Sequence, residues 1–412
     1  MRLNGLNALS FCLLIFNSCT ILCFNTPDCM KIYFPGLNGI RAIAALIVIF
    51  FHVNSTMWFF GSTPVHYFEK RDEMSRHAVV LFFVLSGYLI TYLLIKEKEK
   101  FGTISIQKFY VRRILRIWPL FYVALLLAVL IIPFNKFGKT ISYNLQTIGL
   151  YSLFIPNFAL MAGFKLPSIS PLWSVGIEEQ FYAVWPLFLK AIKNVFSFLV
   201  IFLFGYITLK IVLVVTGNIW SQFSINLNYF SYDTLAIGGI AAWLYAHNHT
   251  VLKVLYHPVL QITAWLFFTV SFVFGPFDVH YIINKEIYSI AFAIIIANVS
   301  TNPAGLIKLK GKVFDFLGRI SYGMYVLHPF IIILAAIPLK HIVPAIHSKP
   351  AQLLLVNAVV VPLTVMVSWL SYRYFESKFL KRKERYSKVL STNTEKDFHS
   401  NEKNIEAEIL SL

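Results

Sequence analysis

Long apolar segments recur along this chain from residue 40 to residue 372, and they restrict its fold more than any other feature. Of its 412 residues, 58% are hydrophobic and only 13% are charged, whereas a soluble domain is usually about 45–50% apolar and about 25% charged. About 20 consecutive apolar residues can cross a bilayer as a helix, because a helix satisfies its own backbone hydrogen bonds in lipid. The sequence therefore predicts an all-α fold, a polytopic transmembrane helix bundle.

Ten segments have the length and apolar character of membrane spans. They cover residues 40–60, 78–95, 114–133, 174–192, 196–216, 230–246, 258–275, 286–300, 314–338 and 352–374. Segment 174–192 carries two carboxylates and competes with residues 145–162 for the fourth position. Since no polar linker divides the spans, we expect one transmembrane domain over residues 30–376. A charged cytoplasmic tail, disordered or loosely helical, would follow over residues 377–412.

Basic residues indicate the side of the membrane on which each loop lies, because cytoplasmic loops are enriched in Lys and Arg. If residue 31 is cytoplasmic, the inside segments 96–113, 301–313 and the chain after residue 372 hold 18 of the 36 Lys and Arg residues, and the outer loop 218–229 holds none. We therefore expect both termini in the cytoplasm. The formal net charge of +17 fits such loops better than nucleic-acid binding, for which the chain has no motif.

All four cysteines, Cys12, Cys19, Cys23 and Cys29, precede Met30. The membrane domain therefore has no cysteine for a structural disulfide or zinc site, and we expect no metal. Residues 1–29 admit three interpretations: an untranslated segment before a true start at Met30, a signal-like leader, or an extra interfacial or spanning helix. We favour the first. A spanning helix is disfavoured, because an odd number of spans would break the charge pattern.

The first span carries two ionisable residues, which are costly at membrane depth and therefore candidates for function. Arg41 and His52 lie eleven positions apart, which is roughly 16 Å along a helix and nearly the same helix face. Alone, Arg41 fits a side chain that reaches back to the interface, and His52 fits a hydrogen-bonded packing residue. Their shared face favours a polar site only modestly.

The third and fourth spans each begin with a charged pair. Arg113 and Arg116 are three positions apart, so they project together, and paired guanidinium groups suit phosphate. On that segment alone, a positive-inside anchor is the better explanation. Glu178 and Glu179 stand at the start of the fourth span, where a carboxylate can act as a general base or orient a histidine.

Four further residues complete the sequence evidence. Asp233 is an acid near the outer end of its span, and His328 lies near the expected depth of His52. Ser86 and Gly87, in the second span, are small residues that let helices approach closely. Taken together, the arginines gather at the cytoplasmic side and the histidines and carboxylates lie deeper, so phosphate binding and acid/base chemistry would share one membrane domain.

At this point the motifs resemble those of a known family, the membrane-bound acyltransferase-3 family of bacterial integral-membrane O-acyltransferases. These enzymes act on O-antigen, peptidoglycan and other glycans. The similarity is collinear from residue 35 to about residue 380. Its motifs are Arg41 with His52, Phe82 to Tyr88, Arg113 to Pro119, Leu172 to Tyr182 and Ile320 to Pro329. Two positions depart from the family pattern: Tyr88 stands where Phe is usual, and Pro329 directly follows His328.

The resemblance implies an O-acyltransferase of the cell inner membrane. Acyl-CoA, usually acetyl-CoA, would be a co-substrate rather than a tightly bound cofactor, and Arg41, Arg113 and Arg116 would hold its phosphates. His52 would be the general base or carry the acyl group briefly, and Glu178 would orient or assist it. The acceptor would be a sugar hydroxyl of a cell-surface polysaccharide or lipid-linked glycan, reached from the periplasmic side.

A polar path of Arg, His and Glu through a helix bundle also suits a transporter. The alternative function is therefore a membrane transporter or exporter of a polar or acylated substrate, without transfer chemistry. Acyl transfer should need His52 and release CoA, whereas transport should move solute without CoA release.

Overall fold

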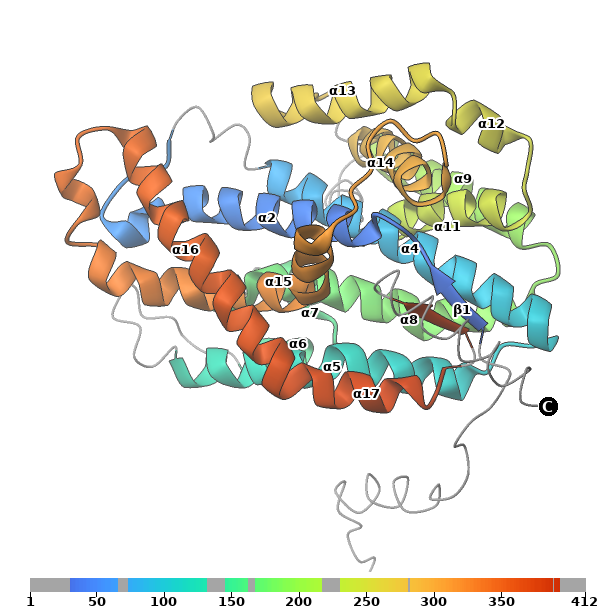
Figure 1. The fold of residues 1–412 in the computed structure, drawn as a ribbon, viewed down its shortest axis with the longest axis horizontal. Coiled ribbons are helices and arrows are strands. Elements are labelled where there is room, and N and C mark those ends of the chain that lie inside the picture. The colour runs from blue at the N-terminus through green and yellow to red at the C-terminus, as the bar shows by residue number, and fades with distance from the viewer. Residues whose placement is uncertain are drawn as a thin grey trace, which may run out of the picture.

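The computed structural model describes residues 30–65, 73–131, 145–161, 167–216, 230–280, 282–387 and 389–392. These residues form a bundle of helices together with two short strands (Figure 1). Residues 1–29 lie outside the described ranges, so the interpretations of that segment stay predictions.

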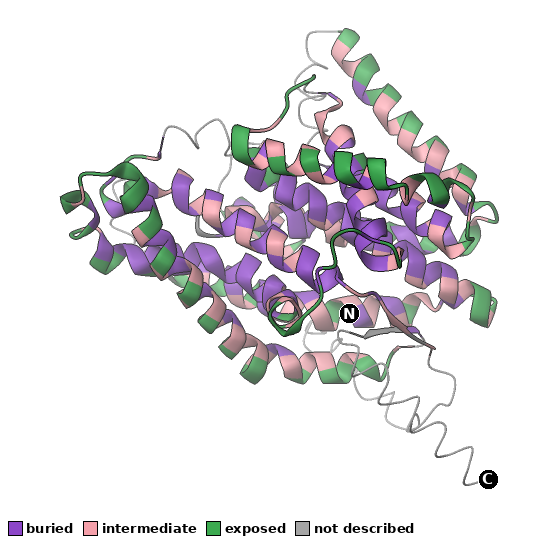
Figure 2. Ribbon diagram, turned by 45° about the horizontal axis from the view of Figure 1, so that its top comes forward, coloured by how far each residue is buried: buried purple, intermediate pink, exposed green. Residues whose placement is uncertain are grey.

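Six helices in the described ranges are long and apolar enough to cross a membrane. They are α2 (Leu37–Ser55), α4 (Glu73–Phe101), α5 (Ile106–Ile131), α9 (Val195–Val215), α15 (Lys312–Leu339) and α16 (Lys349–Ser371). Buried residues concentrate in the centre of the bundle (Figure 2), where α2, α4 and α15 lie. The outward surface of α9 exposes large apolar side chains such as Ile201 and Phe204, as expected of a helix that faces lipid.

Four other helices occupy the remaining predicted spans. They are α8 (Trp173–Ala191), α11 (Tyr232–Ala246), α13 (Pro258–Phe274) and α14 (Asn284–Thr301). All ten predicted segments are therefore helical, while ten complete crossings and the sidedness of the termini stay predictions. The competing range 145–162 contains only α6 (Leu145–Ser152) and α7 (Pro156–Met161), which are too short to span a bilayer.

Short elements connect the long helices. They are η1 (Met57–Phe60), η3 (Pro167–Leu172), α12 (Val251–Leu255) and η4 (Val343–Ala345).

Helices α4 and α11 approach so closely that glycine is required on both. A Cβ atom on Gly87 would collide with the carbonyl oxygen of Leu235, and one on Gly238 would collide with the carbonyl oxygen of Val84. The packing role predicted for Gly87 is confirmed. Its neighbour Ser86 has a different environment and takes part in the polar site described below.

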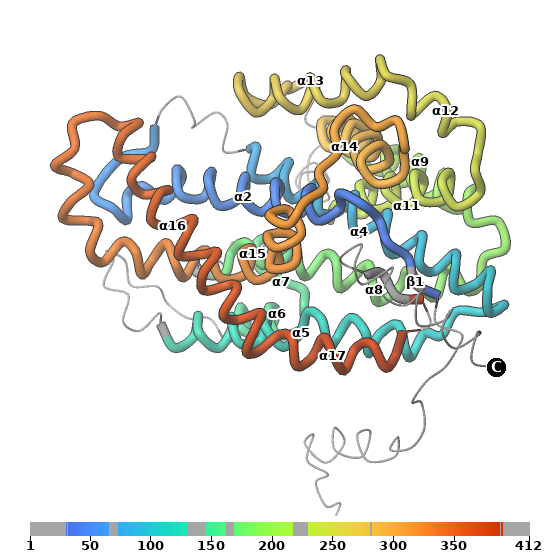
Figure 3. The backbone as a smooth tube through the Cα atoms, in the orientation of Figure 1, coloured from blue at the N-terminus to red at the C-terminus, as the bar shows by residue number. Residues whose placement is uncertain are grey.

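The predicted tail is ordered where the structure describes it. The last long helix continues from α16 through a π-helical turn, η5 (Tyr372–Glu376), into α17 (Ser377–Glu384) (Figure 3). No Gly or Pro interrupts the sequence there, and α17 packs against α5. Residues 377–384 are therefore helical, which is one of the two states expected for this tail.

Two short strands bring the described ends of the chain together. Strand β1 (Met30–Tyr33) directly precedes α2, and β2 (Val389–Thr392) follows α17. They pair in parallel, with Met30 opposite Val389 and Tyr33 opposite Thr392. The two ends therefore lie on the same side of the bundle.

Candidate active site

A pocket with an empty volume of about 910 Å³ opens among α2, α4, α5, α8 and α15. We call it the arginine pocket. Its polar lining residues are Arg41, Ser86, Arg113, Arg116, Ser174, Glu178, Tyr182, Ser321, Tyr322 and Tyr325.

The three arginines expected to bind phosphate do line one pocket. Arg41 comes from α2, and its Nη1 donates to Asn38 Oδ1 at 3.2 Å. Arg113, from α5, places its guanidinium over the ring of Tyr182, with 5.2 Å between the guanidinium carbon and the ring centroid. Within the described ranges, Arg41, Arg113 and Arg116 form no salt bridge to a carboxylate. Such excess positive charge in a pocket attracts an anion.

The two adjacent carboxylates of α8 face different surroundings. Glu178 lines the arginine pocket, where its carboxylate accepts hydrogen bonds from Ser86 Oγ at 2.8 Å and Tyr182 Oη at 3.2 Å. Glu179 accepts from Trp118 Nε1 at 2.9 Å and lines a separate cavity between α5 and α8. Of the two carboxylates, Glu178 therefore faces the arginine pocket and Glu179 does not.

His52 pairs with the second histidine noted in the sequence. Nδ1 of His52 lies 2.8 Å from Nε2 of His328, and the two rings stack with centroids 5.0 Å apart. Nδ1 of His328 lies 3.2 Å from the carbonyl oxygen of Met324. The predicted similarity in depth therefore corresponds to direct contact between the two imidazoles.

This chain of contacts determines where the protons lie. A carbonyl oxygen can only accept, so Nδ1 of His328 carries the proton, and Nε2 of a neutral His328 must then accept. Nδ1 of His52 is accordingly the donor, and its Nε2 keeps a lone pair. In the part of the chain that the structure describes, Nε2 of His52 has no hydrogen-bond partner. In this tautomer, Nε2 of His52 is the atom that can accept a proton.

Tyr325 lies between the arginine pocket and the histidine pair. Its ring lines the pocket, and its centroid is 6.0 Å from that of His328. The Tyr325 hydroxyl donates to the carbonyl oxygen of Pro171 at 2.6 Å and lies 2.7 Å from Ser174 Oγ. His52 does not line the arginine pocket. Of the two residues predicted on one face of α2, Arg41 therefore faces the pocket and His52 lies behind Tyr325.

Glu178, which the resemblance implies would orient or assist His52, makes no hydrogen bond to it among the described contacts, and that role stays a prediction. Its hydrogen bonds go to Ser86 and Tyr182, and the side chain bonded to His52 is His328. Sequence reasoning named His328 without a role. It overlooked Tyr325 and Ser174, although both belong to segments that the sequence had singled out.

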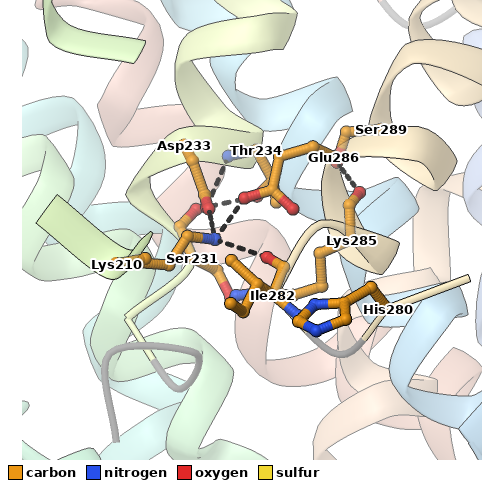
Figure 4. A network of polar contacts seen from close by, with 9 residues as sticks. All are labelled: Lys210, Ser231, Asp233, Thr234, His280, Ile282, Lys285, Glu286 and Ser289. Atoms are coloured by element: carbon orange, nitrogen blue, oxygen red, sulfur yellow. Dashed lines mark hydrogen bonds and ion pairs between the residues drawn. The ribbon is translucent and has the colours of Figure 1, made fainter. Parts of the chain in front are cut away.

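Asp233 belongs to a different polar cluster, away from the arginine pocket (Figure 4). Its Oδ2 lies 2.7 Å from Nζ of Lys210, which also pairs with Glu286 and donates to the carbonyl oxygen of Ile282. Lys285 Nζ donates to Ser231 Oγ at 3.1 Å. The cluster joins α9, α11 and α14, so the contacts of Asp233 are those of a structural ion pair.

Among the described residues, no group of three or more His, Cys, Asp and Glu side chains is arranged to hold a metal ion.

Comparison with known proteins gives one family and several relatives. A family model described as an acyltransferase domain matches residues 34–373, which include the arginine pocket and the histidine pair. The chain is 29% identical over 378 residues to the peptidoglycan O-acetyltransferase OatA of Listeria monocytogenes serovar 1/2a, covering 85% of this chain and 56% of that protein. It is 26% identical over 378 residues to the O-acetyltransferase OatA of Staphylococcus aureus strain NCTC 8325, covering 85% of this chain and 58% of that protein.

The chain thus spans less than two thirds of the length of either relative. No solved structure matches it.

Proposed function

Because this chain belongs to the acyltransferase-3 family, we propose that it is an O-acetyltransferase of the inner membrane that uses cytoplasmic acetyl-CoA. The acceptor is a sugar hydroxyl of a cell-surface polysaccharide or a lipid-linked glycan. Family membership supports a membrane acyltransferase over the transporter. The names of the relatives, both O-acetyltransferases, support acetyl as the transferred group.

The arginine pocket supports acyl-CoA as the donor. CoA carries a diphosphate and a 3′-phosphate, and guanidinium groups bind phosphate through paired, charge-assisted hydrogen bonds. Arg41, Arg113 and Arg116 line the pocket without carboxylate partners in the described ranges. The apolar lining from α4, including Leu89 and Leu93, suits the uncharged arm that links the phosphates to the thioester.

The contact between His52 and His328 supports general-base catalysis, and the proposed mechanism depends on it. Nε2 of His52 takes the proton of the acceptor hydroxyl while the hydroxyl oxygen attacks the thioester carbonyl carbon. The new C–O bond forms, the C–S bond breaks, and the departing CoA sulfur receives the proton from His52. No net proton or electron is gained or lost.

His328 is the positioning residue in this mechanism. Its Nδ1–H is held by the Met324 carbonyl, and its Nε2 accepts from Nδ1 of His52. This bond directs the lone pair of His52 away from the pair and stabilises the imidazolium that forms during the reaction, as a partner on the second ring nitrogen does in other histidine bases. Glu178 acts instead within the arginine pocket, where it holds Tyr182 beneath the Arg113 guanidinium.

The test uses membranes that contain the native chain and acetyl-CoA labelled in the acetyl group. We expect free CoA and labelled glycan to appear in equal amounts, and neither product to form in membranes that lack the chain. Mass spectrometry of the glycan then identifies the acceptor. Entry of label into vesicles without release of CoA would contradict the proposal and favour the transporter.

A further inference from the structure

A second cavity adjoins the arginine pocket at the end of the bundle where β1 and β2 pair. It has an empty volume of about 440 Å³ and shares Ile90, Leu93 and Arg113 with the arginine pocket. We call it the mouth cavity. Its remaining lining residues are Leu94, Glu97, Phe109, Arg112, Lys383, Ser387 and Val389. The two cavities therefore adjoin in series, with Arg113 between them.

One wall of the mouth cavity comes from the C-terminal strap, which we define as residues 377–387 and 389–392. The strap contains α17 and β2, and Lys383, Ser387 and Val389 are its lining residues. It is held in place by the pairing of β2 with β1 and by a hydrogen bond of 2.8 Å from Arg112 Nη1 to the carbonyl oxygen of Tyr386. All of it lies beyond the family match, which ends at residue 373.

The charges in the mouth cavity do not balance. Arg112 is neutralised by Glu97, with 3.3 Å between Nη2 and Oε2. Lys383 and Arg113 have no such partner among the described residues, and the Lys383 ammonium makes no hydrogen bond there. Lys383 is half-buried, whereas its neighbour Lys381 is exposed. Two cations without a salt-bridge partner among the described residues, placed around one cavity, favour a bound anion.

We propose that the C-terminal strap completes the donor site and that Lys383 binds the 3′-phosphate of acyl-CoA in the mouth cavity. The inference rests on the proposed function, because it takes acyl-CoA as the donor. In CoA, the 3′-phosphate lies at the end of the molecule opposite the thioester. The arginine pocket adjoins the histidine pair through Tyr325 and adjoins the mouth cavity through Arg113. The order of histidine pair, arginine pocket and mouth cavity therefore matches the order of thioester, diphosphate and 3′-phosphate along the donor.

The experiment compares KM for acetyl-CoA with KM for 3′-dephospho-acetyl-CoA in the native chain, Lys383→Gln and Lys381→Gln. Loss of a hydrogen bond between charged groups should raise KM for acetyl-CoA on the order of tenfold in Lys383→Gln, with kcat little changed. Lys381→Gln makes the same charge change on an exposed side chain and should leave KM within about twofold. Removal of the 3′-phosphate should raise KM of the native chain similarly and abolish the difference between native chain and Lys383→Gln.

Lys383→Arg keeps the charge and should retain a KM near that of the native chain, which separates loss of binding from misfolding. An unchanged KM for acetyl-CoA in Lys383→Gln would overturn the assignment of Lys383. So would an equal rise of KM for both donors, because the effect would not depend on the 3′-phosphate. If the native chain releases no CoA from acetyl-CoA, the proposed function itself fails, and this result is distinct from the other two.

Discussion

Nδ1 of His52 lies 2.8 Å from Nε2 of His328 across the interface of α2 and α15, although 276 positions separate the two residues. The carbonyl oxygen of Met324 accepts from Nδ1 of His328, so the proton of His328 is on Nδ1 and the proton of His52 is on Nδ1 as well. The pair therefore has one tautomeric arrangement when neutral, and in that arrangement the free lone pair is on Nε2 of His52.

Replacement of His328 should reduce turnover without weakening donor binding. We expect His328→Ala to lower kcat roughly 10- to 100-fold, because His52 loses the acceptor that orients its ring. His328→Gln offers an amide oxygen near the position of Nε2 and should recover part of the activity. Steady-state kinetics with acetyl-CoA measure both effects. A rise of KM with unchanged kcat, or equal loss in both variants, would contradict a positioning role.

Replacement of Arg116 should weaken the donor site. Arg116 lines the arginine pocket and has no salt bridge within the described ranges, so it is available to a phosphate group. We expect Arg116→Ala to raise KM for acetyl-CoA roughly 10- to 100-fold, the effect of a lost charged hydrogen bond. Arg76→Ala is the control, because Arg76 is exposed and paired with Glu73. Similar KM values in the two variants would show that Arg116 does not bind the donor.

A methyl group at Gly238 should destabilise the bundle. It would meet the carbonyl oxygen of Val84 on α4, and backbone atoms cannot move aside without separating the helices. We expect Gly238→Ala to lower the apparent Tm of the detergent-solubilised protein by several degrees, in line with a cost of about 1–3 kcal/mol for overpacking. Gly205→Ala on α9 is the matched control, because no heavy atom lies within 4 Å of the position that a Cβ would take there. Equal Tm values would refute the close approach of α4 and α11.

Loss of the Asp233 carboxylate should destabilise the protein through the cluster of Figure 4 rather than through the chemistry. Asp233→Asn leaves the buried Lys210 ammonium with a single carboxylate partner, Glu286. Breaking a buried ion pair costs about 3–5 kcal/mol, so thermal unfolding should begin at a clearly lower temperature. KM for acetyl-CoA should stay near the native value in protein that is still folded. A variant of native stability with a large loss of kcat would instead place Asp233 in the active site.

The sequence was sufficient to place the helices, because a membrane span must be long and apolar whatever its neighbours are. The sequence also predicted that Arg41, Arg113 and Arg116 lie near one another, since all three were expected near the same membrane surface. Motif order then identified the family. These inferences use local composition, and local composition is what the membrane constrains most strongly.

Contacts between side chains on different helices could not be predicted from the sequence. The bond between His52 and His328 depends on how α2 packs against α15, and the Lys210 cluster depends on three helices. The resemblance implied that Glu178 orients or assists His52, and it gave no sign that the Glu178 carboxylate accepts a hydrogen bond from Ser86. The pairing of β2 with β1 was likewise beyond local composition, because the two strands lie 359 positions apart in the chain.

The most direct test of the central claim is the rate of acetyl transfer in His52→Ala, measured in membranes that contain equal amounts of variant and native protein. Removal of a general base should lower kcat for CoA release and glycan acetylation roughly 100- to 10,000-fold. KM for acetyl-CoA should change little, because His52 lies outside the arginine pocket. Product formation at the native rate in His52→Ala would contradict the account, since no other described residue is assigned to take the proton of the acceptor.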